Sequence, residues 1–201
     1  MKKIFAAIIF LVHSCYSCHG QNTLLMLNGT EFQIKSYEVK GEYITFKKTG
    51  NKSNTTGKYN LDRIYSITDS AKKARIFYYP DTTDDYELNT GDMRTFIDGE
   101  QYAMKHYKKP MNAIAPAIIG ITGAGFLGVY ALVIPFGYVG IANAFSPKVP
   151  LGLDGEPSNI NDPFFIEGYQ YKARKKKAKD GFIFGGLSVV VGLTVFFLFV
   201  N

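Results

Sequence analysis

The feature that most constrains the fold of this chain is a run of 38 residues without a charged side chain, between Lys109 and Lys148. A helix that crosses the hydrocarbon core of a bilayer needs about 20 mostly apolar residues, whereas the core helix of a small soluble domain needs fewer. Asn112 to Ile134 suffices for one crossing, which Pro135 is expected to end or kink. The remainder, Phe136 to Phe145, fits a continuation, an interfacial helix or a re-entrant piece. We predict a first hydrophobic membrane segment over residues 111–145.

A second apolar segment runs from Gly181 to Val200, and 14 of its 20 residues are Leu, Ile, Phe or Val. On an insertion scale these contribute about −0.3 to −0.6 kcal/mol each, which gives roughly −4 to −8 kcal/mol before the polar and small residues subtract from it. We therefore predict a second transmembrane helix over residues 181–201. Together with the first segment it would form a two-helix transmembrane hairpin.

The stretch between the two segments, residues 146–180, is strongly basic. Basic clusters beside membrane segments tend to stay in the cytoplasm, so we predict a basic cytoplasmic loop whose side chains face lipid headgroups. The formal charge of +6 arises mainly from lysines next to apolar segments. That placement favours membrane lipids over nucleic acid as the partner. The cluster consists of Lys172, Arg174, Lys175, Lys176, Lys177 and Lys179.

The N-terminus has the pattern of an export signal. Two lysines precede nine apolar residues, Ile4 to Val12, which are too few to cross a bilayer core of about 30 Å. We predict a signal peptide over residues 1–20 with cleavage before Gln21, and the alternative is lipoprotein processing at Cys15. Export would place the following domain in the periplasm, with the chain held in the bacterial inner membrane.

Residues 21–89 have the pattern of short antiparallel strands. Asn28-Gly29 is a strong hairpin signal because both residues tolerate positive φ, and other turn residues separate runs rich in Ile, Tyr and Phe. We expect an α+β chain with a small antiparallel β-barrel or a curled sheet, of five or six strands. The predicted strands are Leu24 to Leu27, Glu31 to Lys40, Glu42 to Lys48, Lys58 to Leu61, Arg63 to Ile67 and Arg75 to Tyr79.

An amphipathic connecting helix is predicted over residues 90–110. Asp92 is a suitable N-cap, and Gly99 is expected to weaken the helix by roughly 1 kcal/mol relative to alanine. The helix would join the β-rich domain to the membrane or pack on its sheet, and both can hold at once.

Small residues recur at spacings of three and four in both apolar segments. On a helix this spacing gives a groove where a second backbone can approach, so we predict helix pairing or homo-oligomerisation through these positions. Glycine is also common in membrane helices whatever its use. The predicted helix-packing residues are Gly120, Ala124, Gly128, Gly181, Gly185, Ser188 and Gly192.

Motifs that look like chemical sites lack the context that the chemistry requires. Cys15 to His19 has the spacing of haem attachment, but cleavage before Gln21 would remove it. Gly123 to Gly128 matches a dinucleotide fingerprint, yet the first acidic residue downstream is Asp154, too far along for the ribose. We therefore assign no catalytic, cofactor-binding or metal residue and no cofactor, and we expect no enzymatic activity.

Several short motifs suggest a family. Leu27-Asn28-Gly29-Thr30 before the strands, Met93-Arg94, and the run Gly99 to Ala103 before glycine-rich apolar segments resemble uncharacterised exported membrane proteins of Bacteroidetes. The resemblance implies a Gram-negative envelope and a small Sm-like or SH3-like barrel. It implies no reaction and assigns no site residue.

The function expected from these patterns is binding, scaffolding or assembly by a membrane-anchored envelope protein, with a protein partner or a second copy at the transmembrane helices. The alternative is an accessory or sensory subunit that binds a small ligand in its β-rich domain and signals through the membrane hairpin.

Overall fold

The fold is described from a computed structural model, which describes residues 22–49, 55–81, 87–108, 111–152 and 156–200. The chain divides into two compact units, residues 1–90 and 91–201, and each is considered by itself. The predicted signal peptide, Cys15 and the haem-like motif lie outside the described residues.

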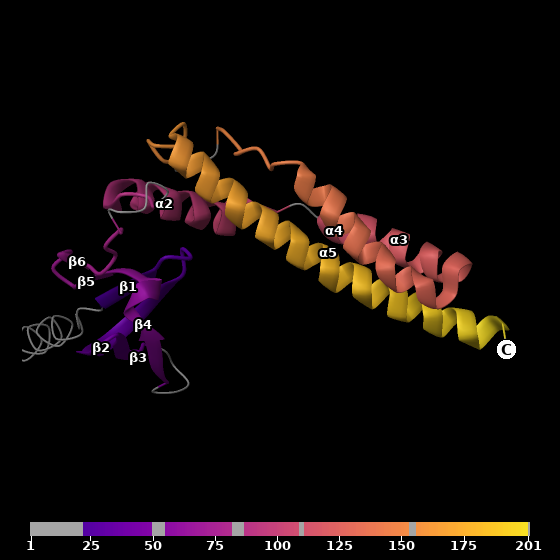
Figure 1. Ribbon diagram of the computed structural model, residues 1–201, viewed down its shortest axis with the longest axis horizontal. Coiled ribbons are helices and arrows are strands. Elements are labelled where there is room, and N and C mark those ends of the chain that lie inside the picture. The colour runs from indigo at the N-terminus through magenta and orange to yellow at the C-terminus, as the bar shows by residue number, and fades with distance from the viewer. Residues whose placement is uncertain (1–21, 50–54, 82–86, 109–110, 153–155, 201) are drawn as a thin grey trace, which may run out of the picture. The chain divides into compact units, whose positions relative to one another are not determined.

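The first unit contains one antiparallel sheet of six strands in the order β4-β3-β2-β1-β5-β6 (Figure 1). Each of the six predicted runs contains a strand, although the last run is a strand only as far as Ile76, and the α+β class is confirmed. The strand bounds are β1 Asn22–Met26, β2 Glu31–Lys40, β3 Tyr43–Lys48, β4 Thr56–Asn60, β5 Ile64–Thr68 and β6 Ala74–Ile76, with a 3-10 turn η1 at Leu61–Arg63.

Two tight turns set the register of the first three strands. Gly29 has φ +76° in the β1–β2 turn, where the backbone N–H of Thr30 donates to the side-chain oxygen of Asn28 at 3.1 Å. Gly41 has φ +58° between β2 and β3, whose last paired residues are Lys40 and Tyr43. Positive φ is the backbone conformation that glycine adopts at little cost, so the glycines account for both hairpins.

The core of the sheet is made of large apolar side chains. In β3 the buried residues alternate, as the period of two in a strand requires, whereas the first four residues of β5 are all buried. Phe46 stacks with Tyr59 and Phe32, at centroid distances of 5.6 and 6.0 Å. The buried members are Leu24, Met26, Ile34, Ile44, Phe46, Ile64 and Ile67.

The sheet is open, with β4 and β6 as its edge strands. Of the two predicted forms, a closed barrel is therefore not found. Closure would require β6 to pair with β4, and β6 has three residues, all exposed. A short edge strand of this kind limits uncontrolled strand pairing with other chains.

The second unit is helical. It contains α2 Thr90–His106, α3 Met111–Leu127, a 3-10 helix η2 Gly128–Val133, α4 Ile134–Ala144 and α5 Pro163–Val200. The predicted connecting helix is thus present as α2. Asp92, predicted as its N-cap, lies within the first turn instead, where a carboxylate still favours the positive end of the helix dipole.

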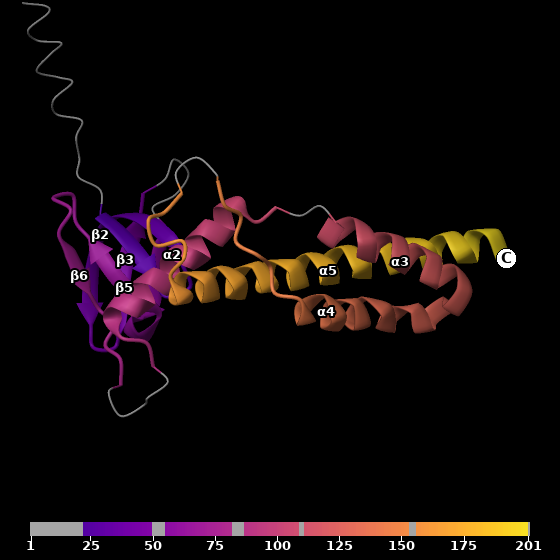
Figure 2. The same ribbon diagram turned by 90° about the horizontal axis from the view of Figure 1, so that it is seen from above.

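The first apolar segment is not one helix from Asn112 to Ile134. It ends at Leu127 because Gly128 has φ +54°, a left-handed conformation that stops an α-helix. After η2 the chain reverses into α4, and Pro135 is the second residue of this new helix, a position where proline is tolerated. Figure 2 shows α3 and α4 each lying along the second half of α5.

Helix α5 continues for 38 residues, from Pro163 to Val200. The segment predicted as a loop, residues 146–180, is therefore helical from Pro163 onward. The Asp162 carboxylate caps the start by accepting the backbone N–H of Phe164 at 2.8 Å. Among the described residues, α5 is the one helix long and apolar enough to cross a membrane, so the two-helix transmembrane hairpin is not confirmed.

Candidate functional site

Helices α2 and α5 cross with their backbones in direct contact. A Cβ atom on Gly99 would overlap the carbonyl oxygen of Phe165, and a Cβ on Gly168 would overlap the carbonyl oxygen of Phe96. Backbone atoms cannot move aside as a flexible side chain can. Glycine is therefore required at both positions for this crossing, and Gly99 is a packing residue rather than a weak point of α2.

The two halves of the crossing are near copies of each other. Residues 96–102 read Phe-Ile-Asp-Gly-Glu-Gln-Tyr, and residues 165–171 read Phe-Ile-Glu-Gly-Tyr-Gln-Tyr. Each glycine meets the carbonyl three residues before the other glycine, so the contact is reciprocal. This repeat is the sequence signal that could have located the crossing, and single-helix periodicity does not reveal it.

Aromatic side chains surround the crossing. The Tyr102 ring lies 5.7 Å from that of Phe165 and 6.1 Å from that of Tyr169, and Tyr107 meets Tyr169 edge-on at 6.4 Å. Burial, with nearby Tyr107 and Tyr102, raises the pKa of Tyr169 to about 12. The phenol is therefore neutral at any physiological pH. The His106 ring packs on that of Tyr102 at 4.3 Å between ring centroids.

The two repeated segments, residues 96–102 and 165–171, differ most in chemistry at Glu100, because the equivalent residue in the second segment is Tyr169. The residue is 1% exposed. One carboxylate oxygen lies 3.8 Å from Lys172 Nζ, and the other has no hydrogen-bond partner among the described residues. Burial raises the pKa of Glu100, although Lys172 and Lys175 act in the opposite direction. An incompletely paired buried carboxylate is costly for stability, which makes it the polar group most in need of explanation.

The basic cluster has structural partners as well as exposed members. Lys176 Nζ donates to the carbonyl oxygens of Tyr107 at 2.9 Å and Met104 at 3.2 Å, and so satisfies the C-terminal end of α2. Arg174 contacts Ser146, and Lys175 contacts the Tyr171 hydroxyl. Lys172 pairs with Glu100, Lys177 is half-buried, and Lys179 is exposed.

Small residues also lie between α3 and α5 farther along. A Cβ on Gly120 would overlap Ser188 and approach the Gly185 carbonyl oxygen at 3.0 Å, and a Cβ on Gly192 would lie 2.7 Å from Ala124 Cβ. The Ser188 hydroxyl donates to the Gly185 carbonyl at 2.7 Å and lies 3.3 Å from that of Pro116. Five of the seven predicted packing residues thus lie at one interface.

The other two predicted packing residues have different surroundings. Gly181 faces α4, where its Cβ would lie 3.1 Å from Val139 Cγ2. A Cβ on Gly128 would meet no atom within 4 Å, and its positive φ accounts for glycine at this position.

No protein-family model, no curated protein and no solved structure matches this chain. The proposals below therefore depend on the geometry and chemistry of the chain itself.

Proposed function

We propose that the chain is a membrane-anchored protein of the bacterial envelope whose sheet domain binds a protein partner, in a scaffold or assembly role. The observation that carries the proposal is that the polarity and the burial of the side chains change from the first half of α5 to the second. In its first half, Tyr169 is buried, and Lys172 and Lys176 pair with groups of α2. In its second half, large apolar side chains are exposed.

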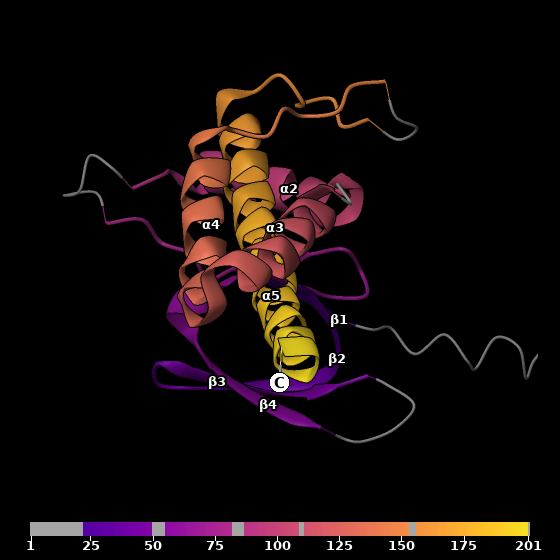
Figure 3. The same ribbon diagram turned by 90° about the vertical axis from the view of Figure 1, so that its right-hand side faces the viewer.

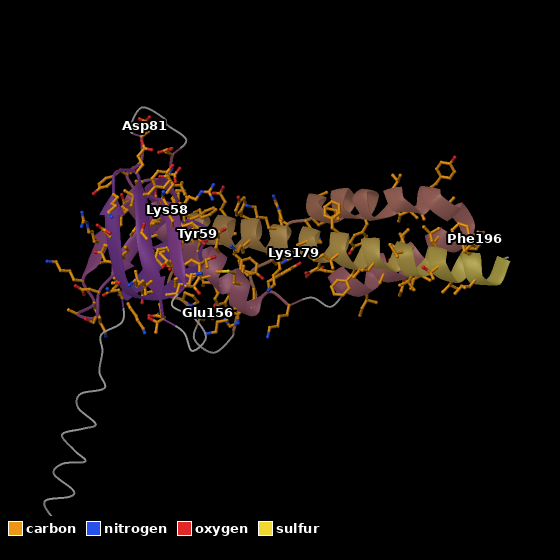
Figure 4. The ribbon with its side chains drawn as sticks, turned by 90° about the horizontal axis from the view of Figure 1, so that it is seen from below. Lys58, Tyr59, Asp81, Glu156, Lys179 and Phe196 are labelled. Carbon is orange, nitrogen blue, oxygen red and sulfur yellow. The ribbon has the colours of Figure 1, made fainter. Side chains whose placement is uncertain are left out.

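The apolar exposure extends over all three helices of the distal half. Phe126 on α3 is 90% exposed, and Leu198 on α5 is 74% exposed. Figure 4 marks the part of α5 concerned, from Lys179 to Phe196. Water would penalise such a surface by about 25 cal/mol for each square ångström, whereas lipid tails would cover it without cost.

The sheet domain supplies the surface for a partner. Tyr79, after the last strand, is 82% exposed, and Tyr43 and Ile76 are also exposed. Tyrosine is enriched at protein interfaces because it presents a large rigid surface with a polar end. The export signal predicted from the sequence supports a periplasmic position for this domain.

Membrane anchoring is tested by alkaline extraction of membranes from cells that produce the full chain. We expect the chain to remain with the lipid, as a protein with inserted helices does. Release into the soluble fraction by alkaline carbonate would contradict the proposal.

The binding role is tested by a photo-crosslinking amino acid at Tyr79 in the full chain, in native membranes. We expect adducts of discrete mass, with the same substitution at exposed Lys72 as the control site for random collisions. The absence of any adduct at Tyr79 and at Tyr43 would count against a protein partner.

A further inference from the structure

Three contacts fix the direction of α3 beside the apolar half of α5. Gly120 lies against Gly185 and Ser188, and farther along α3 Ala124 lies against Gly192. Residue numbers rise together on the two helices, so α3 runs parallel to α5. Figure 3, which looks along the helices, shows α3 and α4 both lying against α5.

Helix α4 runs in the opposite direction. Near its start Ala131 and Ile134 cluster with Val189 and Leu193, and at its middle Val139 lies against Gly181. The chain that follows stays at that level, because Ser146 contacts Arg174 and the Tyr102 hydroxyl donates to the Pro150 carbonyl at 3.2 Å.

Both ends of the α3-η2-α4 segment therefore lie beside the same part of α5. Asn112, at the start of α3, donates to the Tyr107 hydroxyl at 3.1 Å, and the Tyr107 carbonyl accepts from Lys176. The segment enters the apolar layer near Lys176 and returns to the same level. Whether it reaches the far side or turns back within the lipid, it ends on the side where it began.

This arrangement differs from the topology that charge alone predicts. In a two-helix hairpin the basic run before α3 and the basic run before the apolar half of α5 lie on opposite faces. In the structure the two runs lie at the same level along α5, because Lys176 Nζ donates to the carbonyl oxygens of Met104 and Tyr107 at the end of α2. An exported domain can carry basic residues across a membrane, since long translocated regions follow charge only weakly.

We infer that the basic residues at the end of α2 and in the middle of α5 form one belt on a single face of the membrane, and that this belt binds anionic phospholipid headgroups. Its exposed members are Lys105, Lys108, Arg174, Lys175 and Lys179. The inference rests on the proposed membrane anchoring. It names the lipid class that the anchored protein selects.

Two features make a phospholipid the occupant that fits. The belt is cationic, and lysines near a membrane surface attract anionic lipid. The apolar side chains begin within three residues of Lys179, with Phe182, Ile183 and Phe184 all exposed. A ligand held here meets positive charge and apolar surface together, which matches a headgroup with its acyl chains.

The shared face is tested by labelling with a membrane-impermeant maleimide on intact spheroplasts. Ser70→Cys reports the sheet domain and Ser158→Cys reports the connection before α5, with the unsubstituted chain as background. We expect both cysteines to label alike, and a tag after Asn201 to be found on the opposite face. Labelling of one cysteine without the other would overturn the single belt.

Lipid selection is tested by native mass spectrometry of the purified full chain with phosphatidylglycerol or phosphatidylethanolamine. We expect phosphatidylglycerol adducts to predominate, and the variant with Lys105, Lys108, Lys175 and Lys179 changed to Gln to bind this lipid about tenfold more weakly. A control with the same charge change carries Gln at Lys35, Lys47, Lys72 and Lys73 of the sheet domain and should keep the preference. Glycerol phosphate, which lacks acyl chains, should not compete.

Equal adducts of the two lipids, or an equal loss in the control variant, would overturn the inference. A chain that resists alkaline extraction and yet shows no lipid preference would contradict the belt alone. A chain that alkaline carbonate releases would contradict the membrane anchoring itself.

Discussion

The sheet and the crossing of α2 with α5 are stabilised in opposite ways. In the sheet, large side chains such as Phe46, Ile34 and Ile44 are fully buried and fill the interior. At the crossing, Gly99 and Gly168 have no side chain, and two backbones occupy the space. The comparison indicates that the sheet is sensitive to residues made smaller, and the crossing to residues made larger.

The largest effect is expected in the sheet. Phe46→Ala should lower the free energy of unfolding by about 3 to 5 kcal/mol, because it removes a buried ring and leaves a cavity. Thermal unfolding of the full chain in detergent, monitored by near-ultraviolet circular dichroism, measures it. Tyr79→Ala is the matched control, since this side chain is exposed and should cost little. Equal losses for the two variants would contradict the packing of the sheet.

The crossing should respond to a single added methyl group. Gly168→Ala is expected to destabilise the helical unit by about 1 to 3 kcal/mol, because the methyl group overlaps a backbone carbonyl. Gly186→Ala in the same helix is the control, since its Cβ would meet nothing within 4 Å. There the higher helix propensity of alanine should give a gain of up to about 1 kcal/mol. The same sign for both variants would refute the backbone contact.

Glu100 should make the stability of the helical unit depend on pH. Its pKa in the folded chain is raised by burial, so the folded state holds the proton more tightly than the unfolded state. Stability should therefore be highest below the unfolded pKa and should decline as pH rises through the raised folded pKa. Unfolding midpoints between pH 4 and pH 8 test this, and Glu100→Gln should remove the dependence. A decline of the same size in Glu100→Gln would assign it to other groups.

The smallest effect is expected at Ser188. Its hydroxyl lies 3.3 Å from the Pro116 carbonyl of α3, and a hydrogen bond between membrane helices contributes about 0.6 kcal/mol on average. Ser188→Ala should lower stability by about that amount in a detergent titration. Thr194→Ala is the control, because the Thr194 hydroxyl bonds to the Val190 carbonyl of its own helix. A larger loss in the Thr194 variant would contradict the ranking.

The strands could be predicted because their signals are local. Asn28-Gly29 and Gly41 mark turns, and alternation marks the strands between them. The open form of the sheet was not predictable in this way, because it depends on whether β4 forms backbone hydrogen bonds with β6. The residue pattern within a strand does not show which other strand it pairs with. Pro135 was expected to interrupt the first apolar segment, but the interruption lies at Gly128, whose positive φ is a tertiary feature.

Part of the candidate site could be predicted, because the sequence indicated small residues in the apolar segments. The structure places five of the seven predicted helix-packing residues between α3 and α5. The crossing of α2 with α5 was missed. Periodicity describes one helix at a time, so Gly99 was interpreted by its helix propensity alone. The partner of Gly99 lies 69 residues later, at Gly168, and only a comparison of the chain with itself would have paired them.

The repeat at this crossing also has a consequence for how copies of the chain recognise one another. Two surfaces that are near copies can pair with themselves as well as with each other, so α2 of one molecule could in principle lie on α2 of a second. That pairing would bury Glu100 twice without a lysine, and pairing of α5 with α5 would bring two copies of Lys172 together. Only α2 on α5 unites the carboxylate with the ammonium group. The ion pair thus disfavours both like pairings by charge, and it acts as a specificity determinant even where it adds little to stability.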